Sequence, residues 1–204
     1  ADNSLQMAES TDVSPSSGKE FFQKCIVAAV FAAIVLILYI AIRFKNIGGW
    51  LAGICAVIAL FHDIIVVYGT FVIFGMEIDA NFMAVILTIL GYSINDTIVI
   101  YDRIRENKTL YKDKLSLAEL TNLSTNQSLT RSINTSVTTI ATMLVVTIVA
   151  MVYGVNSIIS FSFPMMIGLI SGTYSTICIA GPLWVWLEEK KNGGNRPKAE
   201  AAAE

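Results

Sequence analysis

The chain has 204 residues, of which 54% are hydrophobic and only 15% are charged, and its formal net charge is −2. Soluble domains carry about 25% charged residues, so this composition excludes an ordinary soluble domain and indicates a membrane protein. The charge balance gives no support to nucleic-acid binding. Cys25, Cys55 and Cys178 lie in apolar stretches and are expected to be free thiols, and no cysteine–histidine spacing predicts a metal site or a cofactor.

Uncharged apolar stretches predict about five transmembrane helices, because roughly 20 apolar residues cross a bilayer. We place these spans at about 22–42, 49–74, 80–101, 132–153 and 158–187. The expected fold class is therefore all-α, a polytopic membrane helical bundle over residues 19–190. Residues 1–18 are polar and lack the features of a signal peptide, so we interpret them as the end of an exported domain or a linker. Residues 191–204 are low in complexity and are expected to form a disordered tail.

Twelve of the 14 Lys and Arg residues fall on one predicted side of the membrane. They lie between the first and second spans, between the third and fourth spans, and after the fifth. The positive-inside rule predicts a cytoplasmic C-terminus and an outside N-terminus for this chain. Because an outside N-terminus needs an export signal, we expect another span and an exported domain to precede residue 1.

The predicted cytoplasmic loop, residues 102–131, is polar but contains a helix signal. Ser116 and Glu119 fit a capping box, in which two side chains satisfy the first free amides of a helix. Leu117, Leu120 and Leu123 follow it with helical spacing. We expect a short connecting helix here, either an ordinary one or one lying against the membrane surface.

Asp96 lies inside the third span, about sixteen residues or roughly 24 Å from its start, with no basic residue beside it. An isolated carboxylate in a bilayer costs roughly 2.5–3.5 kcal/mol on insertion scales, and it usually has a partner, a water-filled cavity or a proton to carry. Ser93 shares its helix face and Asn95 widens the polar stripe. Asp96 is either fixed in a structural hydrogen-bond network or, as we favour, carries a proton or binds an ion.

His62 and Asp63 interrupt the second span at a depth similar to that of Asp96. Two acids and a histidine at one depth predict a polar cluster inside the bundle. His62 either orients its neighbours by hydrogen bonds or acts in the function. An ionised Asp63 would also need a partner, which favours a functional role.

Arg131 opens the fourth span and is followed by hydroxyl and amide side chains at helical spacing, among them Thr135 and Thr139. Such side chains either hydrogen-bond between closely packed helices or line a hydrated proton path. Arg131 either reaches the membrane surface or turns inward to pair with Asp96. In the second arrangement, a small movement of the guanidinium would switch the acid between holding and releasing a proton.

Several glycines predict close helix packing. Gly49 and Gly53 are four residues apart, as are Gly168 and Gly172, and this spacing lets helices approach each other. The dipeptide at residues 181–182, Gly-Pro, predicts a kink or an end in the fifth span.

Two long motifs carry a resemblance to a known family. Residues 91–99 read Gly-Tyr-Ser-Ile-Asn-Asp-Thr-Ile-Val, and residues 102–107 read Asp-Arg-Ile-Arg-Glu-Asn. Residues 126–139 read Asn-Gln-Ser-Leu-Thr-Arg-Ser-Ile-Asn-Thr-Ser-Val-Thr-Thr. These stretches closely resemble the fourth-span signature and the fifth-span entry of the SecF family of bacterial protein-export membrane subunits, and the His-Asp pair at 62–63 is similar to that family's third-span pair. The resemblance covers about residues 13–190.

The resemblance implies the architecture of the resistance-nodulation-division superfamily, with six spans and a large exported domain between the first two. This chain would then hold the C-terminal five spans of SecF or of a fused SecDF. The implied function is non-enzymatic: assistance of SecYEG-dependent translocation in the bacterial plasma (inner) membrane, driven by proton flow. The implied partners are SecD, SecYEG, the translocating preprotein, YajC and membrane lipid.

Site roles follow from motif position for two residues. Asp96 matches the proton-relay acid of the family and Arg131 its essential arginine. Asp63 joins the predicted relay on the physical argument above. The predicted supporting polar residues are His62, Asn95, Ser93, Thr135 and Thr139.

Two other functions fit parts of the pattern. A proton-driven small-molecule efflux transporter of the same superfamily would share the intramembrane acids, but would need a binding cleft in an exported domain. An intramembrane aspartyl protease would need Asp63 and Asp96 close enough to share a proton, and no protease motif accompanies them.

Overall fold

The computed structural model describes residues 15–112 and 114–191, and these residues form helices and short connections without a strand. The elements are α1 (Pro15–Arg43), η1 (Lys45–Ile47), α2 (Gly49–Ile73), α3 (Ala80–Tyr111), α4 (Leu117–Tyr153), α5 (Asn156–Ser175), η2 (Thr176–Ala180) and α6 (Gly181–Lys191). Most of the predicted end of an exported domain, and the predicted disordered tail, lie outside the described residues. Residues 15–18 already belong to α1.

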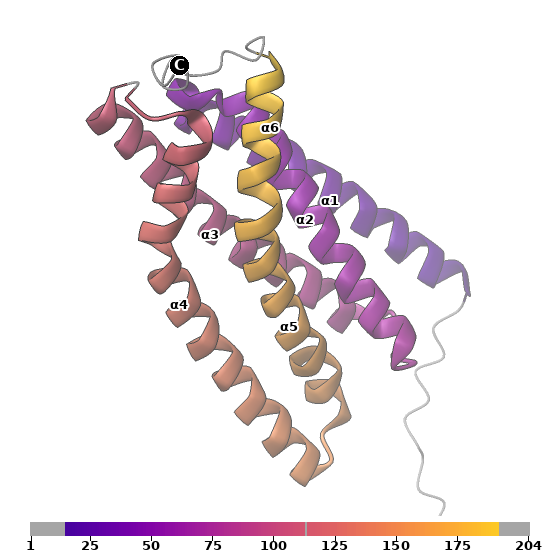
Figure 1. Cartoon of the computed structure of the whole chain (residues 1–204). Coiled ribbons are helices and arrows are strands. Elements are labelled where there is room, and N and C mark those ends of the chain that lie inside the picture. The colour runs from indigo at the N-terminus through magenta and orange to yellow at the C-terminus, as the bar shows by residue number, and fades with distance from the viewer. Residues whose placement is uncertain (1–14, 113, 192–204) are drawn as a thin grey trace, which may run out of the picture.

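Five helical segments are long and apolar enough to cross a membrane: 26–43, 49–73, 80–111, 117–153 and 156–191. The predicted all-α bundle of five spans is thereby confirmed, and the chain is a multi-pass membrane protein. Helix α5 packs against α2, α3 and α4, whereas α1 packs mainly on α2 (Figure 1). The site therefore forms where α2 and α3 meet α5.

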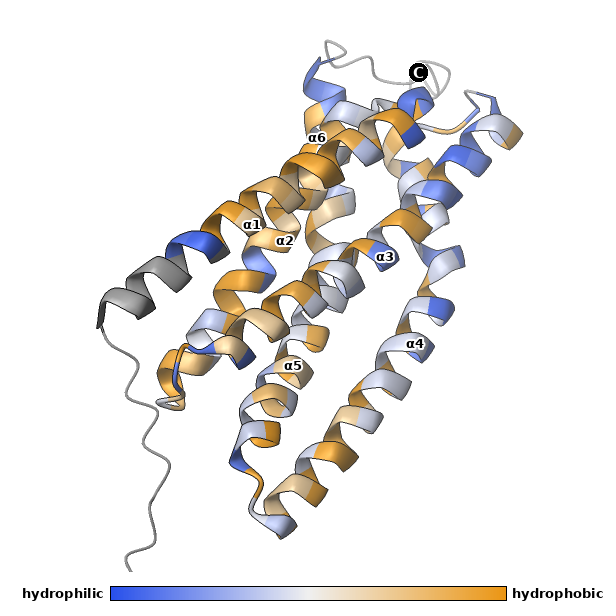
Figure 2. Cartoon of the chain, turned by 180° about the vertical axis from the view of Figure 1, so that it is seen from behind, coloured by the Kyte–Doolittle hydropathy of each residue, from blue (hydrophilic) through white to orange (hydrophobic). Residues whose placement is uncertain are grey.

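Charged residues gather at the end of the bundle where α6 ends, and apolar residues make up most of α2 and of the coloured part of α1 (Figure 2). Polar contacts tie this end together. Arg43 at the end of α1 forms an ion pair with Asp102 of α3 at 3.2 Å, and Lys108 of α3 donates to the backbone oxygen of Asn46 at 3.1 Å. The ends of α1 and α3 thus share one side of the bundle, as the distribution of basic residues predicts.

Residues 102–131, which were predicted to form a loop, are mostly helical, because α3 continues to Tyr111 and α4 begins at Leu117. Hydropathy marks only the apolar part of a helix, and a helix can continue beyond the membrane core when its polar residues find partners. Here Arg103 pairs with Glu106 at 2.6 Å within α3. The real connection between the two helices is short.

The capping box is confirmed, but the short surface helix behind it is not. The Ser116 hydroxyl accepts from the backbone N–H of Glu119, and the Glu119 carboxylate accepts from the backbone N–H of Ser116. The residues that follow are the first turns of α4, and Leu120 is buried in the core of the bundle. The amphipathic leucine pattern faces protein, because α4 stays packed on α3 and α6.

The fifth span is interrupted near the predicted position. Residues 176–180 form a π-helical turn, η2, directly before Gly181 and Pro182. Proline has no N–H, and its ring would clash with the carbonyl group four residues earlier. The wider turn of a π-helix relieves this clash without ending the helix. The prediction of a kink or an end is thus resolved as a π-turn between α5 and α6.

Both glycine pairs are packing positions, as predicted. A Cβ atom at Gly49 would lie 2.6 Å from the backbone oxygen of Ala41, and one at Gly53 would lie 3.1 Å from that of Ile37. A Cβ atom at Gly168 would overlap the side chain of Ile89 of α3. The absence of side chains at these positions lets α2 approach α1 and lets α5 approach α3.

We expect Gly49→Ala to destabilise the bundle by about 1–3 kcal/mol, because its methyl group would meet rigid backbone of α1. Gly69→Ala is the matched control, since Gly69 lies within α2 and a methyl group there would have no neighbouring atom within 4 Å. The control should be neutral or slightly stabilising. Thermal unfolding of the purified chain in detergent measures both, and equal midpoints for the two variants would contradict the packing role.

Candidate functional site

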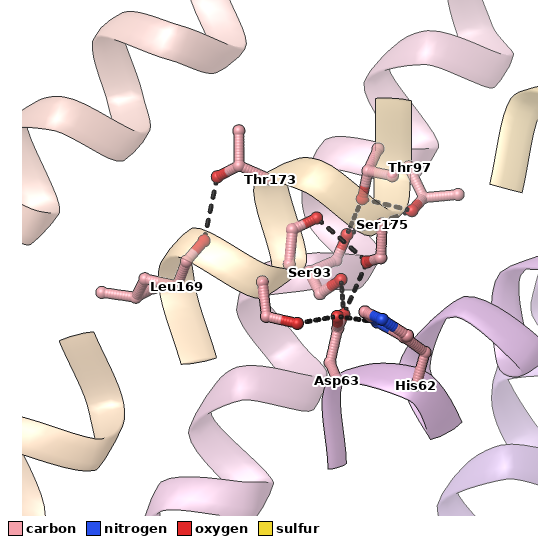
Figure 3. Close-up of polar contacts among 10 residues, drawn as sticks. His62, Asp63, Ser93, Thr97, Leu169, Thr173 and Ser175 are labelled. Atoms are coloured by element: carbon pink, nitrogen blue, oxygen red, sulfur yellow. Dashed lines mark hydrogen bonds and ion pairs between the residues drawn. The ribbon is translucent and has the colours of Figure 1, made fainter. Parts of the chain in front are cut away.

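Asp63 of α2 is completely buried, and its carboxylate is surrounded by hydroxyl groups (Figure 3). One oxygen, Oδ2, accepts hydrogen bonds from Ser93 of α3 at 2.9 Å and from Ser175 of α5 at 2.8 Å. The other oxygen, Oδ1, accepts from Ser171 of α5 at 2.7 Å. Hydrogen bonds to a charged group are among the strongest in proteins. A single acid therefore joins three transmembrane helices.

His62 lies beside this carboxylate, with Nδ1 3.2 Å from Oδ1 of Asp63. Its side chain is 38% exposed, whereas that of Asp63 is 0% exposed. The imidazole ring also contacts the ring of Tyr174 at a centroid distance of 6.2 Å. The histidine thus lies between the buried acid and the outer surface of the bundle, a position that fits both the orienting role and the functional role predicted for it.

The local sequence explains how α5 reaches Asp63. Ser171 and Ser175 are four residues apart, so both hydroxyls lie on one face of α5. Gly172 lies on that face as well, and a Cβ atom there would be 3.2 Å from Cβ of Ser93 and 3.6 Å from Oδ2 of Asp63. The glycine brings the α5 backbone close enough for two serine side chains to reach one carboxylate.

A second contact between hydroxyls joins α3 to the π-turn. The hydroxyls of Thr97 and Thr176 lie 3.1 Å apart, and both also bond to the backbone oxygen of Ser93. Thr176 is the first residue of η2. The π-turn therefore begins at the point where the fifth span is attached to α3.

Asp96 lies on a different side of α3. Asp96 is 5% exposed. The polar and charged side chains near its carboxyl group are those of Ser132 and Arg131 of α4. Its Oδ2 atom has no hydrogen-bond partner among the described residues, and the same holds for Oγ of Ser132. The neighbouring Tyr92, one turn earlier, donates to Ser136 of α4 at 3.4 Å.

The polar side chains that were predicted to share one face with Asp96 therefore contact two different neighbouring helices. Ser93 faces Asp63 and α5, whereas Tyr92 and Asp96 face α4. Within the described part of the chain Arg131 forms no ion pair, and its side chain is exposed. It is near enough for its charge to act on Asp96, but it does not contact it. The proposed arginine switch stays a prediction.

The other predicted supporting residues take part less directly. The hydroxyls of Thr135 and Thr139 bond to carbonyl groups of their own helix at 2.9 and 2.8 Å, and Asn95 is exposed. The hydroxyl-rich face of α4 thus contains two classes of side chain. Threonines bond within the helix, whereas serines at 132 and 136 are buried against its neighbours.

Sequence reasoning missed Ser171, Ser175 and Thr176, which complete the Asp63 cluster. Small hydroxyl residues are common in membrane helices, so their presence in the fifth span was no specific signal. The spacing of the two serines around a packing glycine was the available clue. The described residues contain no group of three His, Cys, Asp or Glu side chains that could hold a metal ion.

Known proteins resemble this chain over most of its length. Residues 1–190 match the family described as "Protein export membrane protein SecD/SecF, C-terminal". The chain is 40% identical over 173 residues to the protein translocase subunit SecF of Alicyclobacillus acidocaldarius, covering 85% of this chain and 54% of that protein. It is 39% identical over 175 residues to the protein translocase subunit SecDF of Bacillus subtilis, covering 85% of this chain and 23% of that protein.

The fold of a solved relative agrees with these matches. The crystal structure of SecDF from Thermus thermophilus, described as a translocon-associated membrane protein, superposes with a TM-score of 0.77 at 36% identity, covering 87% of this chain and 23% of that one. The chain thus spans about half the length of the SecF relatives it matches and about a quarter of the SecDF relatives.

We expect Ser175→Ala to lower the free energy of unfolding by about 1–2 kcal/mol, because a buried carboxylate loses one of its hydroxyl donors. The control is Thr138→Val, since the Thr138 hydroxyl is exposed and bonds only to its own helix. That variant should leave stability unchanged. Unfolding of the detergent-solubilised chain measures the difference, and the interpretation of Asp63 as the link between helices fails if the two variants behave alike.

Proposed function

This chain belongs to the SecD/SecF family of protein-export membrane proteins, and we propose on that premise that it is the membrane-spanning part of a SecF-like subunit of a SecDF complex. The subunit assists SecYEG-dependent translocation of preproteins across the bacterial plasma membrane, and proton flow drives it. The observation that carries the proton coupling is the buried carboxyl group of Asp96, which has an oxygen without a hydrogen-bond partner among the described residues.

The relatives support SecD as a partner, and the exposed apolar surface of the bundle supports further contacts in the membrane. Some relatives are single SecDF chains, so the partner bundle of this chain is SecD. Long apolar parts of α4 are exposed, including Val145, Val149 and Val152, and they suit a contact with another helix bundle or with lipid. SecYEG, the translocating preprotein and YajC are the further partners. The C-terminus faces the cytoplasm, as the basic residues favour.

The proposed relay centres on Asp96 and Arg131. A protonated Asp96 is neutral and needs no counter-charge in the apolar bundle. After the proton leaves, the carboxylate attracts the guanidinium of Arg131, whose charge already acts on it across the boundary between α3 and α4. One proton that crosses the membrane supplies about 2.3 kcal/mol per 100 mV, which is enough energy to move one long side chain between two positions.

Asp63 and His62 form the second part of the proposed relay. The histidine is half-buried and contacts a carboxylate that is itself bonded to α3 through Ser93. The His62–Asp63 pair is therefore connected through Ser93 to the same helix that carries Asp96. The Asp63 cluster links the protonation of the bundle to the relative positions of α2, α3 and α5.

The two other functions gain no support. The relatives found are named as translocase subunits and not as efflux transporters. The carboxylates of Asp63 and Asp96 have different neighbours, on α5 and on α4 respectively. These separate neighbours give no support to the close pair of carboxylates that an aspartyl protease requires.

Asp96→Asn is expected to abolish proton flux and the stimulation of export, because an amide cannot take up and release a proton. The test uses the full-length subunit assembled with SecD in proteoliposomes, with co-purification of SecD as the measure of assembly. Thr88→Val is the matched control on the same helix, since its exposed hydroxyl bonds only to its own backbone. Full export by an assembled Asp96→Asn complex would refute the proposed coupling.

We expect the charge of Arg131, and not the shape of its side chain, to determine its contribution to proton flux. We expect Arg131→Gln to reduce proton flux about tenfold or more, the equivalent of about 1.4 kcal/mol. Arg131→Lys should retain a larger part of the flux, because it keeps a cation beside the carboxyl group. Initial rates of proton uptake in the same proteoliposomes measure both, and equal rates for the two variants would show that the charge of residue 131 is not what matters.

A further inference from the structure

Four serines of α4 are buried at a regular spacing of four residues. They are Ser124, Ser128, Ser132 and Ser136, with exposed fractions of 0%, 6%, 1% and 4%. Residues four apart lie on one face of a helix, so these hydroxyls form a single row, here called the serine row. Thr135, Thr138 and Thr139 bond to their own backbone, which leaves the serine row as the polar surface that this part of α4 presents to its neighbours.

The middle of the serine row meets Asp96. Oδ2 of Asp96 and Oγ of Ser132 are both buried, and neither has a hydrogen-bond partner among the described residues, although Ser132 is near enough to act on the acid. A buried polar atom without a partner costs about 1–3 kcal/mol. Two such atoms beside each other are the polar lining that a bound water molecule requires.

The end of the serine row that lies at the charged end of the bundle is closed by a polar network. The side-chain amide of Asn107 donates to Ser124 and to Gln127, each at 2.8 Å. Gln127 also accepts from Nε of Arg103 at 2.7 Å, and Arg103 is partly exposed. This network connects the serine row to the predicted cytoplasmic side.

Ser128 is the hydroxyl between this network and Asp96. Residues four apart on a helix are about 6 Å apart along its axis, which is too far for a direct hydrogen bond but close to the length of two. One water molecule can therefore bridge each pair of neighbouring hydroxyls in the row. On α3 the residue one turn after Asp96 is Ile100, which offers no polar group.

We propose that the boundary between α3 and α4 along the serine row is the path by which protons pass between Asp96 and the cytoplasm, carried by water bound at Ser132 and Ser128. The O–H bond of protonated Asp96 breaks as a water molecule takes the proton, and the water chain releases a proton to cytoplasmic water beside the Arg103–Gln127–Asn107 network, whose own side chains accept none. The carboxylate that remains faces the charge of Arg131. This path rests on the proposed function, because it assigns an exit to the proton that Asp96 carries.

The test substitutes Ser128, because its hydroxyl lies between Asp96 and the Asn107 network along the proposed path. Ser128→Val should slow proton flux about tenfold or more, because it removes the hydroxyl and fills the space of the bridging water. Ser128→Ala removes the hydroxyl but leaves that space, so its flux should fall between that of Ser128→Val and the unsubstituted protein. The measurement is the initial rate of proton uptake by the full-length subunit with SecD in proteoliposomes.

The matched control is Ser162→Val, since Ser162 is equally buried but bonds to Thr147, away from the serine row. It should leave the flux unchanged. If Asp96→Asn abolishes flux while Ser128→Val matches Ser162→Val, the path is wrong and the proposed function stands. If Asp96→Asn itself leaves flux intact, the proposed function fails first.

A second measurement does not depend on activity and guards against a poorly folded valine variant. In a protein whose natural cysteines are replaced, Ser128→Cys and Ser132→Cys introduce thiols into the path. A small, charged, membrane-impermeant thiol reagent added on the cytoplasmic side should modify both, and Ser162→Cys should not react. Equal protection of all three thiols would overturn the proposal.

Discussion

The bundle depends on how it satisfies a carboxyl group that water does not reach. Asp63 is fully buried, and no Lys or Arg side chain among the described residues pairs with it. Its charge is compensated instead by three serine hydroxyls from two other helices, with His62 at the edge. In lipid there is little hydrophobic force between helices, so hydrogen bonds and close packing decide which helices associate. The Asp63 cluster therefore fixes how α2, α3 and α5 are rotated and how closely they approach.

The two acids within the apolar helices have opposite environments. Both oxygens of Asp63 accept hydrogen bonds, whereas one oxygen of Asp96 has none within the described residues. An acid whose two oxygens both accept hydrogen bonds is held in place by its donors. The structure thus distinguishes an acid that joins three helices from an acid with an acceptor oxygen that no described side chain fills.

Local patterns in the sequence predicted the parts of the fold that depend on local physics. The five apolar spans, the capping box at Ser116 and the glycine pairs each follow from residues near one another in the chain, and each is found. The ends of α3 and α4 were misplaced, because contacts such as Asn107 to Ser124 extend both helices beyond the membrane core. The partners of Asp63 could not be predicted for a related reason. Which face of the fifth span meets α2 depends on packing between helices that are more than 100 residues apart in the chain, and many hydroxyl side chains were available to the acid.

The stripe around Asp96 shows the same limit, since Ser93 and Asp96 were grouped on one face and in fact meet different helices. They are three residues apart, so they are separated by about 60° around α3 at 3.6 residues per turn. Ser93 and Thr97 attach α3 to the Asp63 cluster and to the π-turn, while Tyr92 and Asp96 point toward α4. One side of α3 is held by several hydrogen bonds, whereas on the other side Asp96 meets the serine row of α4, in which the Ser132 hydroxyl has no partner among the described residues. Only 17% of the apolar part of α4 is buried, compared with 44% for α2 and for α3, so less of α4 than of either of them lies inside the described bundle.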